Sequence, residues 1–324
     1  RDMITRTDIL AQLERGMKVG FLNGQKTYTP LRSAFVDETT SDGAFETYAD
    51  MGATPWPAQV SGQNPGTATD GRTGAPSVGG LHEGGPITIL GGNERSLTVY
   101  NRGWDIPVGI YHDAINDSRV GNLESWARSM AVRFEQHKDN LAFDALNAGA
   151  ASTYGTAYDG QVFFSANHAD PGGQYTTVQS NVNTLALSLA NFETVYIAAS
   201  SYFDDRGKPS GITPDLLIHS VNLKRTAAQI TDNPEDYATG NRAVNPYRGD
   251  ISRLMAPGGW LDSTAWFLVS SQPGMKPLGM QIRQQPQLFF WDDHTQGGGI
   301  RYYKWYARYE IFYRDWRNAT QGQS

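Results

Sequence analysis

Residues 122–147, NLESWARSMAVRFEQHKDNLAFDALN, carry the strongest helical pattern in this sequence of 324 residues. Positions three or four apart in this stretch are apolar or aromatic, as on one face of a helix. They are Leu123, Trp126, Met130, Phe134, His137, Leu141 and Ala145. At about 1.5 Å per residue the helix would run roughly 40 Å, and Gly149 is placed to end it. The sequence therefore predicts one unusually long helix.

Two segments of opposite character precede this helix. The chain opens with an amphipathic stretch, for which Thr7 serves as a helix cap. Its apolar residues are Ile4, Ile9, Leu10, Leu13, Met17 and Phe21. Residues 51–92, by contrast, are rich in proline and glycine and poor in large apolar side chains, so they cannot build a core of their own. They form either a disordered linker or a long projecting loop that only a partner orders.

Strand patterns flank the long helix. Residues 97–111 alternate as in a half-buried strand and break at Gly103, which predicts a pair of strands. After the helix, the turn signal Asp159 and Gly160 stands before the apolar trio 162–164. This order predicts a hairpin or short strand within residues 158–170.

The second half of the chain alternates helix and strand patterns. We expect helices at residues 191–204 and 223–230 and buried strands at residues 216–218 and 265–269. This order indicates a mixed α/β unit with a central sheet. The last strand is the clearest, with Tyr303, Trp305, Ala307, Tyr309, Ile311 and Tyr313 on a buried face. Lys304, Arg308, Glu310 and Arg314 lie on the face expected to be wet.

Composition excludes several classes of protein. The net charge is −6 and 19% of the residues are charged, so the basic surface of a tight nucleic-acid binder is missing. The chain contains no cysteine, which fits assembly in a reducing cytoplasm without proving it. No apolar run approaches the roughly 20 residues that cross a bilayer. The sequence predicts a soluble protein without a membrane partner.

Catalytic motifs are missing. The six histidines stand far apart, and none is paired at the spacing of helical zinc sites. His82 and Glu83 begin a metalloprotease-like string but lack its second histidine. No phosphate-binding loop, dinucleotide fingerprint or nucleophile elbow occurs. We therefore predict no enzyme and no catalytic, cofactor-binding or metal-ligating residue, and no cofactor.

Three features allow a more specific hypothesis. His168 with Asp170 could form an acid/base pair or a metal corner, but a lone histidine is usually structural. The pairs 204–205 and 292–293 are aspartates that could bind calcium. A calcium cage needs about six oxygen donors, so solvated turns are favoured. Trp56 and the aromatic C-terminus could stack on sugars, but the alternating pattern favours a core or an interface.

Four stretches together resemble a known family. They are residues 96–118, SLTVYNRGWDIPVGIYHDAINDS; residues 158–170, YDGQVFFSANHAD; residues 212–230, ITPDLLIHSVNLKRTAAQI; and residues 264–290, TAWFLVSSQPGMKPLGMQIRQQPQLFF, with Lys276 and Pro277 in a turn. The sequences of these stretches and their order along the chain resemble those of the major head subunit of Mu-like bacteriophages, a family with the Hong Kong 97 phage capsid fold. The resemblance covers the chain from Ser96 to the end; the first 95 residues match only in layout.

The resemblance implies an α+β (mixed α/β) fold with a definite division of the chain. Residues 1–33 would be an N-terminal arm and residues 34–95 an extended loop lying across a neighbouring subunit. Residues 96–183 would be a peripheral domain with a spine helix at 122–147. Residues 184–285 would be an axial domain, and residues 286–324 a C-terminal strand that returns to the peripheral domain.

The same resemblance implies a structural function. The chain would be a tailed-phage major capsid protein that assembles with itself into the pentamers and hexamers of an icosahedral head, in the host cytoplasm and then in the virion. Portal, scaffold or decoration proteins would be further partners, and double-stranded DNA would be held only by confinement. Trp56, His82 and Arg95 are the expected intersubunit contacts.

Two details of the sequence qualify this expectation. Some shells of this fold are welded by bonds from a lysine on the extended loop to an asparagine, but no lysine occurs between Lys26 and Lys138. We expect non-covalent shells, and a ladder of multimers on a denaturing gel would contradict this. Arg1 is compatible with removal of a preceding segment by a maturation protease or with a flexible segment ahead of it, which the intact mass distinguishes.

Two rival functions stay open from the sequence. A cellular nanocompartment shell has the same fold and would enclose a cargo enzyme instead of DNA. A carbohydrate-binding or carbohydrate-active β-rich protein would explain the abundance of Trp, Tyr and Gly. The second rival predicts a stable monomer that binds glycans, whereas a capsid protein predicts very large particles.

Overall fold

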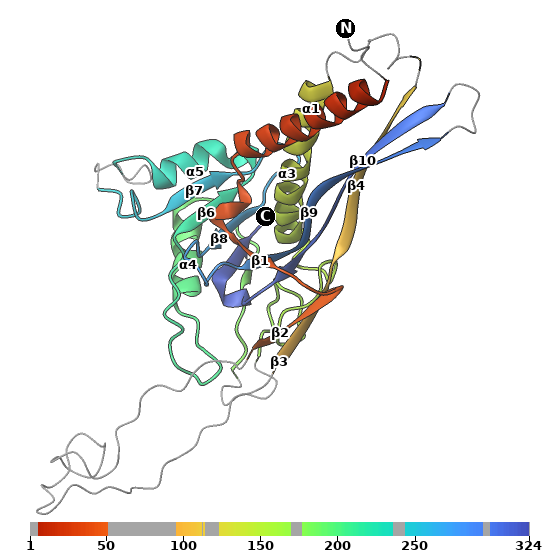
Figure 1. The fold of residues 1–324 in the computed structure, drawn as a ribbon. Helices are drawn as coiled ribbons and strands as arrows, with labels where there is room; N and C mark the ends of the chain where they lie inside the picture. The colour runs from red at the N-terminus through yellow and green to blue at the C-terminus, as the bar shows by residue number, and fades with distance from the viewer. Residues whose placement is uncertain are drawn as a thin grey trace, which may run out of the picture.

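The long helix lies against a sheet made from distant parts of the chain (Figure 1). The computed structural model describes residues 6–50, 95–111, 113, 123–169, 177–235, 244–293 and 299–323. Helix α3 runs from Leu123 to Asn147, within one residue of the expected bounds. Helix α1 (Arg6–Thr27) packs along α3, so closely that a Cβ at Gly20 would lie 2.4 Å from the Glu124 carbonyl oxygen.

The four-stranded sheet carries α3 on one face. Its strands are β1 (Val36–Thr40), β9 (Leu278–Asp293), β10 (Ile300–Tyr313) and β4 (Arg102–Tyr111), in the order β1-β9-β10-β4. Only β1 and β9 are parallel. The predicted alternation of β10 is confirmed, because its aromatic and aliphatic face is buried. The Tyr313 hydroxyl donates to the Ala145 carbonyl of α3 at 2.8 Å.

A five-stranded sheet forms the second layer of the molecule. Its order is β5 (Val182–Asn183), β11 (Ala319–Gly322), β8 (Trp266–Val269), β6 (Leu216–His219) and β7 (Ser252–Met255). Helices α4 (Leu189–Ser200) and α5 (Lys224–Thr231) contact its strands. The 3-10 turns η1 (Arg32–Ala34), η2 (Val221–Leu223) and η3 (Trp316–Asn318) precede β1, α5 and β11. The predicted strands at 216–218 and 265–269 are confirmed.

A separate two-stranded sheet consists of β2 (Phe45–Asp50) and β3 (Arg95–Tyr100). The strands are antiparallel, with Phe45 opposite Tyr100 and Asp50 opposite Arg95. They flank residues 51–94, which lie outside the described part of the chain. The choice between a linker and a projecting loop therefore stays open.

Three local predictions are wrong. The strand break falls at Asn101, and Gly103 lies inside β4, where a Cβ would stand 2.6 Å from the Tyr306 hydroxyl. Residues 158–169 form turns and no strand, because Phe163 and Phe164 fill the core with their rings instead of pairing in a sheet. Glu310, which was expected on the wet face of the last strand, is only 5% exposed.

Helix α4 also ends earlier than expected, at Ser200. The next aromatic side chain, Tyr202, leaves the helical path, and its hydroxyl lies 2.9 Å from Thr320 Oγ1 of β11. A tertiary hydrogen bond thus replaces the last predicted helical turn.

The strands also bear on the expected division into domains. A boundary between residues 285 and 286 would fall inside β9, which pairs with β10 on both sides of that point. The final strand, β11, lies in the five-stranded sheet, between β5 and β8. The chain therefore crosses between the two larger sheets more than once. Among the described residues, no helix combines the length and apolar character needed to span a bilayer.

Candidate functional site

The base of the β2–β3 hairpin is fixed to the body of the molecule. The Tyr48 ring stacks on the Phe312 ring, with 4.6 Å between centroids and 19° between planes. The Tyr48 hydroxyl donates to Gln281 Oε1 at 3.1 Å, and Gln281 Nε2 donates to the Val99 carbonyl at 3.0 Å. Since Gln281 is fully buried in β9, one buried amide ties both hairpin strands to the four-stranded sheet.

A carboxylate shapes the turn that leads into this hairpin. Glu46 Oε1 accepts from the Gly43 nitrogen at 2.9 Å, the Ser41 hydroxyl at 2.9 Å and the Asp42 nitrogen at 2.8 Å. The hydrogen bond from Gly43, followed by those from Ser41 and Asp42, lowers the pKa of Glu46. Asn101 Nδ2 donates to Ser41 Oγ at 2.7 Å from the other end of the hairpin. The turn is thus closed from both strands.

The turn with Lys276 and Pro277 holds the start of β1. Lys276 Nζ donates to the Ser33 carbonyl at 2.6 Å and lies 3.6 Å from Asp37 Oδ1. Asp37 Oδ2 also accepts from the Gly274 nitrogen at 3.2 Å and from Arg314. Two cations and a backbone donor therefore fasten β1 beside β9.

A buried ion cluster fixes the segment between α1 and β1 to α3. Arg32, only 3% exposed, pairs with Glu135 at 2.8 Å and with the fully buried Asp139 at 2.9 Å. Lys138 pairs with Glu135 at 2.9 Å. Burial raises the pKa of Glu135, but the charges of Lys138 and Arg32 lower it by more. The Tyr28 hydroxyl donates to Asp139 Oδ2 at 2.7 Å, and burial together with this bond raises the pKa of Tyr28.

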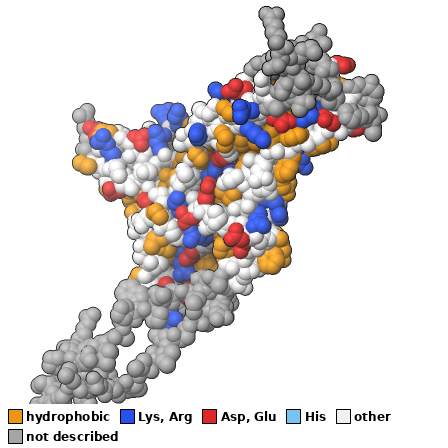
Figure 2. All heavy atoms as spheres, in the orientation of Figure 1, with side chains coloured by type: hydrophobic (Ala, Val, Ile, Leu, Met, Phe, Trp, Pro, Cys, Tyr) orange, Lys and Arg blue, Asp and Glu red, His pale blue; other side chains and the backbone are white. Residues whose placement is uncertain are grey.

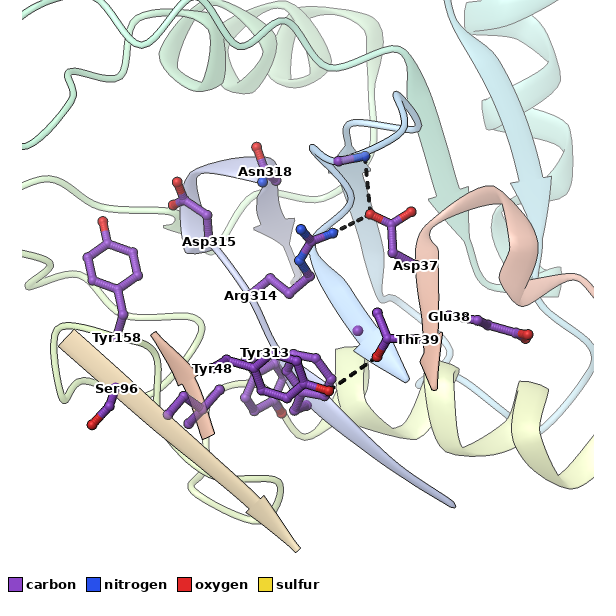
Figure 3. A pocket seen from close by; sticks show the side chains of 14 residues that line it. Asp37, Glu38, Thr39, Tyr48, Ser96, Tyr158, Tyr313, Arg314, Asp315 and Asn318 are labelled. Atoms are coloured by element: carbon purple, nitrogen blue, oxygen red, sulfur yellow. Dashed lines mark hydrogen bonds and ion pairs between the residues drawn. The ribbon is translucent and has the colours of Figure 1, made fainter. Parts of the chain in front are cut away.

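A pocket of about 600 Å³ opens between these anchors (Figure 3). Its lining residues come from β1, the two hairpin strands, the turn 158–169, the start of β9 with the turn before it, and the end of β10 with the segment after it. They are Asp37, Glu38, Thr39, Tyr48, Ser96, Leu97, Tyr158, Gly274, Gly279, Phe312, Tyr313, Arg314, Asp315 and Asn318. The polar side chains of the lining are three carboxylates, five hydroxyls, one amide and one guanidinium.

The far end of the β9–β10 hairpin projects from the body of the molecule (Figure 1). Phe289, Phe290 and Trp291 are 46%, 45% and 45% exposed. Trp291 stacks on Tyr302 at 5.2 Å between ring centroids. A protruding ribbon with adjacent exposed rings is the kind of surface that partners cover.

Of the three predicted contact residues, only Arg95 lies in the described part of the chain. Trp56 and His82 lie outside the described residues. Arg95 is the first residue of β3, paired through its backbone register with Asp50.

His168 has a structural environment. It is fully buried, its Nδ1 lies 2.6 Å from Asp159 Oδ2, and its ring stacks on Trp316 at 4.1 Å. Its Nε2 lies 3.1 Å from Asn181 Oδ1. Asp170, its expected partner, lies outside the described residues. The histidine links the turn 158–169 to η3 and to the residue that precedes β5.

The two aspartate pairs are not open calcium cages. Asp204 and Asp205 are nearly buried, so the expected solvated turn is wrong there: Asp205 pairs with Arg317 at 2.7 Å because the C-terminal segment packs over it. Asp292 pairs with Arg301 at 2.9 Å. Across the described ranges, no three His, Asp or Glu side chains converge on a point where a metal ion could sit.

One face of the molecule carries charges of mixed sign. On the face drawn in Figure 2, Lys and Arg side chains alternate with Asp and Glu, and hydrophobic side chains lie between them. Such a surface lacks a single-signed field that would attract a polyanion.

The anchors could not have been found by motif. Asp37, Tyr48, Gln281 and Arg314 are single polar or aromatic residues more than 200 positions apart at the extremes. Only the strand order brings them to one place.

Known proteins resemble this chain in sequence and in fold. The model of a family described as phage capsid protein matches residues 108–320. A chain of the procapsid of bacteriophage JBD30 is similar over 99% of this chain and 76% of its own length, with 17% identity and a TM-score of 0.53. A chain of the JBD30 capsid decorated with minor capsid protein trimers matches over 72% and 92%, with 19% identity and a TM-score of 0.50.

A third solved structure, from Microbacterium phage Oxtober96, covers 99% of both chains with 12% identity and a TM-score of 0.52. At these identities the likeness concerns the fold, and the expected mixed α/β capsid fold is confirmed. No curated protein matches the sequence.

Proposed function

The chain belongs to the phage capsid protein family, and from this premise we propose that it is the major head subunit of a tailed, Mu-like bacteriophage. The observation that carries the proposal is the family match over residues 108–320, which takes in α3 and most strands of the two larger sheets. Copies assemble into the pentamers and hexamers of an icosahedral head around double-stranded DNA. The subunit forms the capsid shell and catalyses no reaction.

Each segment of the chain has its own role in assembly. In this proposal residues 1–33 are an arm, residues 34–95 are an extended loop that reaches a neighbouring subunit, and α3 is the spine of a peripheral domain. The five-stranded sheet with α4 and α5 forms the axial domain. The anchors around Tyr48 and Arg32 support this division, because they hold the roots of the loop and of the arm rigidly.

Neighbouring subunits hold one another without covalent bonds. Trp56, His82 and Arg95 contribute contacts from the loop and its root, and the exposed rings of the β9–β10 hairpin contribute a second surface. The absence of lysine between Lys26 and Lys138 supports a shell without loop-lysine cross-links. Interfaces of this kind gain stability from total area more than from single contacts.

The subunit assembles in the host cytoplasm and ends in the virion. Its partners there are further head proteins, such as portal and scaffold proteins. The JBD30 capsid that this chain resembles is decorated with minor capsid protein trimers, so a decoration protein is a partner to seek. The DNA is confined rather than gripped, which fits a net charge of −6 and a surface of mixed sign.

Negative-stain microscopy of the purified protein tests the proposal. We expect closed shells or ring-shaped capsomers, and shells from infected cells should contain DNA. DNA-free particles loaded with an enzyme would indicate a nanocompartment, and a stable glycan-binding monomer would indicate a carbohydrate-binding protein. Either result would overturn the proposal.

Deleting residues 51–92 tests the role of the loop. We expect a soluble subunit that retains its melting temperature but forms no closed shells, because the anchors at the hairpin root lie outside the deletion. A deletion variant that forms normal shells would refute the loop assignment.

A further inference from the structure

The pocket beneath the β2–β3 hairpin contains a buried acceptor without a partner. Asn318 is 6% exposed, and its Oδ1 has no hydrogen-bond partner among the described residues. Its backbone is fully used, since its nitrogen donates to the Asp315 carbonyl and its carbonyl accepts from the Ser270 nitrogen. Buried carbonyl groups in folded proteins are nearly always paired. The Asn318 side chain therefore offers a place for a donor from outside the chain.

A donor lies on the same side of the pocket. Arg314 uses Nη1 to bind Asp37, and no acceptor within the described ranges takes its remaining N–H groups. Three other polar groups nearby are engaged: the Thr39 and Tyr48 hydroxyls lie 3.2 Å apart, and Asp315 Oδ1 binds Arg317. Figure 3 shows Arg314 and Asn318 on one side of the pocket, across from Tyr48.

These free groups match those of a peptide backbone. A peptide unit brings an N–H for Asn318 Oδ1 and a carbonyl for the Arg314 guanidinium. Strand β1, which contributes Asp37, Glu38 and Thr39 to the lining, is an edge strand of the four-stranded sheet. An edge strand is a template for another extended chain. The volume of about 600 Å³ lies within the range of ligand pockets and admits a short extended segment.

The charges point to a weakly charged occupant. The lining carries three carboxylates and one guanidinium. Each carboxylate is matched by a cation: Asp37 by Lys276 and Arg314, Glu38 by Arg32, and Asp315 by Arg317. A polyanion or polycation gains nothing from such a balanced surface. The chain itself is weakly charged, with 19% charged residues, and in a shell its most abundant neighbour is another copy.

We propose that this pocket, bounded by Asn318, Arg314, β1 and the hairpin root, receives an extended peptide segment of a second copy of the chain. The inference rests on the proposed shell function and names one of its intersubunit sites. The segment donates a backbone N–H to Asn318 Oδ1 and offers a carbonyl to Arg314. The pocket is thus a recipient site that only assembly fills.

The first test uses opposite effects on folding and on assembly. Asn318→Leu removes the acceptor and keeps the shape of the side chain. Because the acceptor is unpaired in the free subunit, the variant should melt at the same temperature as the wild type or higher. Its critical concentration for shell assembly should rise about tenfold through loss of one buried hydrogen bond per site.

Ser200→Ala is the matched control, because Ser200 Oγ is also buried and unpaired among the described residues but lies in α4. It should leave assembly unchanged. Asn318→Leu subunits that fold and assemble at the wild-type concentration would overturn the proposal.

The second test works even where Asn318→Leu folds poorly. A photo-crosslinking amino acid replaces Ser96, which is an exposed lining residue of β3. Shells are built from a mixture of unlabelled (light) and nitrogen-15-labelled (heavy) subunits, and the crosslinker is then activated by light. We expect crosslinked peptides that combine one light and one heavy chain in shells, and none in free subunits. Crosslinks confined to one chain, crosslinks to a different protein, or no crosslink would each refute the inference. If the wild type forms no shells at all, the proposed function fails first.

Discussion

Replacing Arg32 by methionine should unfold the subunit more easily, by an amount that the ion cluster defines. Arg32 pairs with Glu135 and Asp139, which are both buried. Breaking a buried ion pair by removing one partner costs about 3–5 kcal/mol. The third ion pair of Arg32, with the half-exposed Glu38, adds at most about 1 kcal/mol to this cost.

The lower end of this range applies, because Asp139 keeps other donors. It still accepts from the Tyr28 hydroxyl at 2.7 Å and from the Leu31 nitrogen at 2.9 Å. We expect Arg32→Met to lower the free energy of unfolding by about 3 kcal/mol, or the melting temperature by roughly 5–10 °C. Methionine fills a similar volume, so the loss reports on charge rather than on packing.

The loss should depend on pH in a definite direction. The folded-state pKa of Glu135 is lowered, so its ion pairs contribute stability above the ordinary carboxyl pKa and lose it as the pH falls through the lowered value. The difference between wild type and Arg32→Met should therefore be full at neutral pH and shrink below about pH 4.5.

Thermal and urea unfolding of unassembled subunits at pH 7 and pH 4 would measure this difference. Arg133→Met, an exposed arginine on the same helix, is the control and should change stability by less than about 0.5 kcal/mol. A double variant with Asp139→Asn should recover part of the loss, because Asp139 is the carboxylate that loses its cation, whereas Glu135 still pairs with Lys138. If Arg32→Met unfolds like the control, the buried cluster does not stabilise the arm as argued.

Two further predictions concern a carboxylate and two glycines. Burial raises the pKa of Glu310, although Arg102 and a backbone hydrogen bond lower it, so Glu310 costs stability as the pH rises above the ordinary carboxyl range. Arg102 Nε lies 2.9 Å from Glu310 Oε2 but without hydrogen-bond geometry. We therefore expect Glu310→Gln to raise the free energy of unfolding by about 1 kcal/mol at pH 7 and to leave it unchanged below pH ~4. Urea titrations at both pH values would measure this. Gly279→Ala should destabilise by about 1–3 kcal/mol, since its Cβ would stand 2.3 Å from the Phe312 ring. Gly16→Ala, a helical position with nothing within 4 Å, should stabilise by up to about 1 kcal/mol in thermal and urea unfolding. If both glycine variants changed the stability in the same direction, the packing described here would be contradicted.

The long elements could be predicted because their patterns are strong and local. Helix α3 and strand β10 each bury one face over many residues, so their periodicity exceeds the noise of single positions. The short buried strands β6 and β8 were found for a related reason: uninterrupted apolar runs of three residues at 216–218 and five residues at 265–269 suit a strand buried on both faces.

Other elements carry no such pattern. Strand β1, with the sequence VDETT, is mostly polar, and it is a strand only because the turn with Lys276 and the Arg32 cluster hold it beside β9. The trio at 162–164 reads as a strand but serves the core, because its two phenylalanine rings stack on Tyr313 and Phe267. Tertiary contacts decide both cases, and these contacts join residues far apart in sequence.

The candidate site could not be predicted for the same reason. Asn318 gives no signal in the sequence, since one asparagine near the end of a chain is unremarkable. Its meaning depends on a pocket formed by β1, β2, β3 and the end of β10. The predicted contact residues Trp56 and His82 rest on the layout of the family, and the structure leaves them as predictions.

The anchors and the exposed parts of this subunit complement each other. A two-stranded ribbon such as β2–β3 is marginal on its own, yet one stacked pair and one buried glutamine hold its root. Near the far end of the β9–β10 hairpin, Arg301 pairs with Glu14 of α1 at 2.6 Å, while three adjacent aromatic residues of β9 stay exposed. Rigid roots with uncovered extremities suit assembly, because the root sets the direction of each projection before a neighbour arrives. Less conformational entropy is then lost when copies meet, so many individually weak contacts can close a shell without covalent bonds.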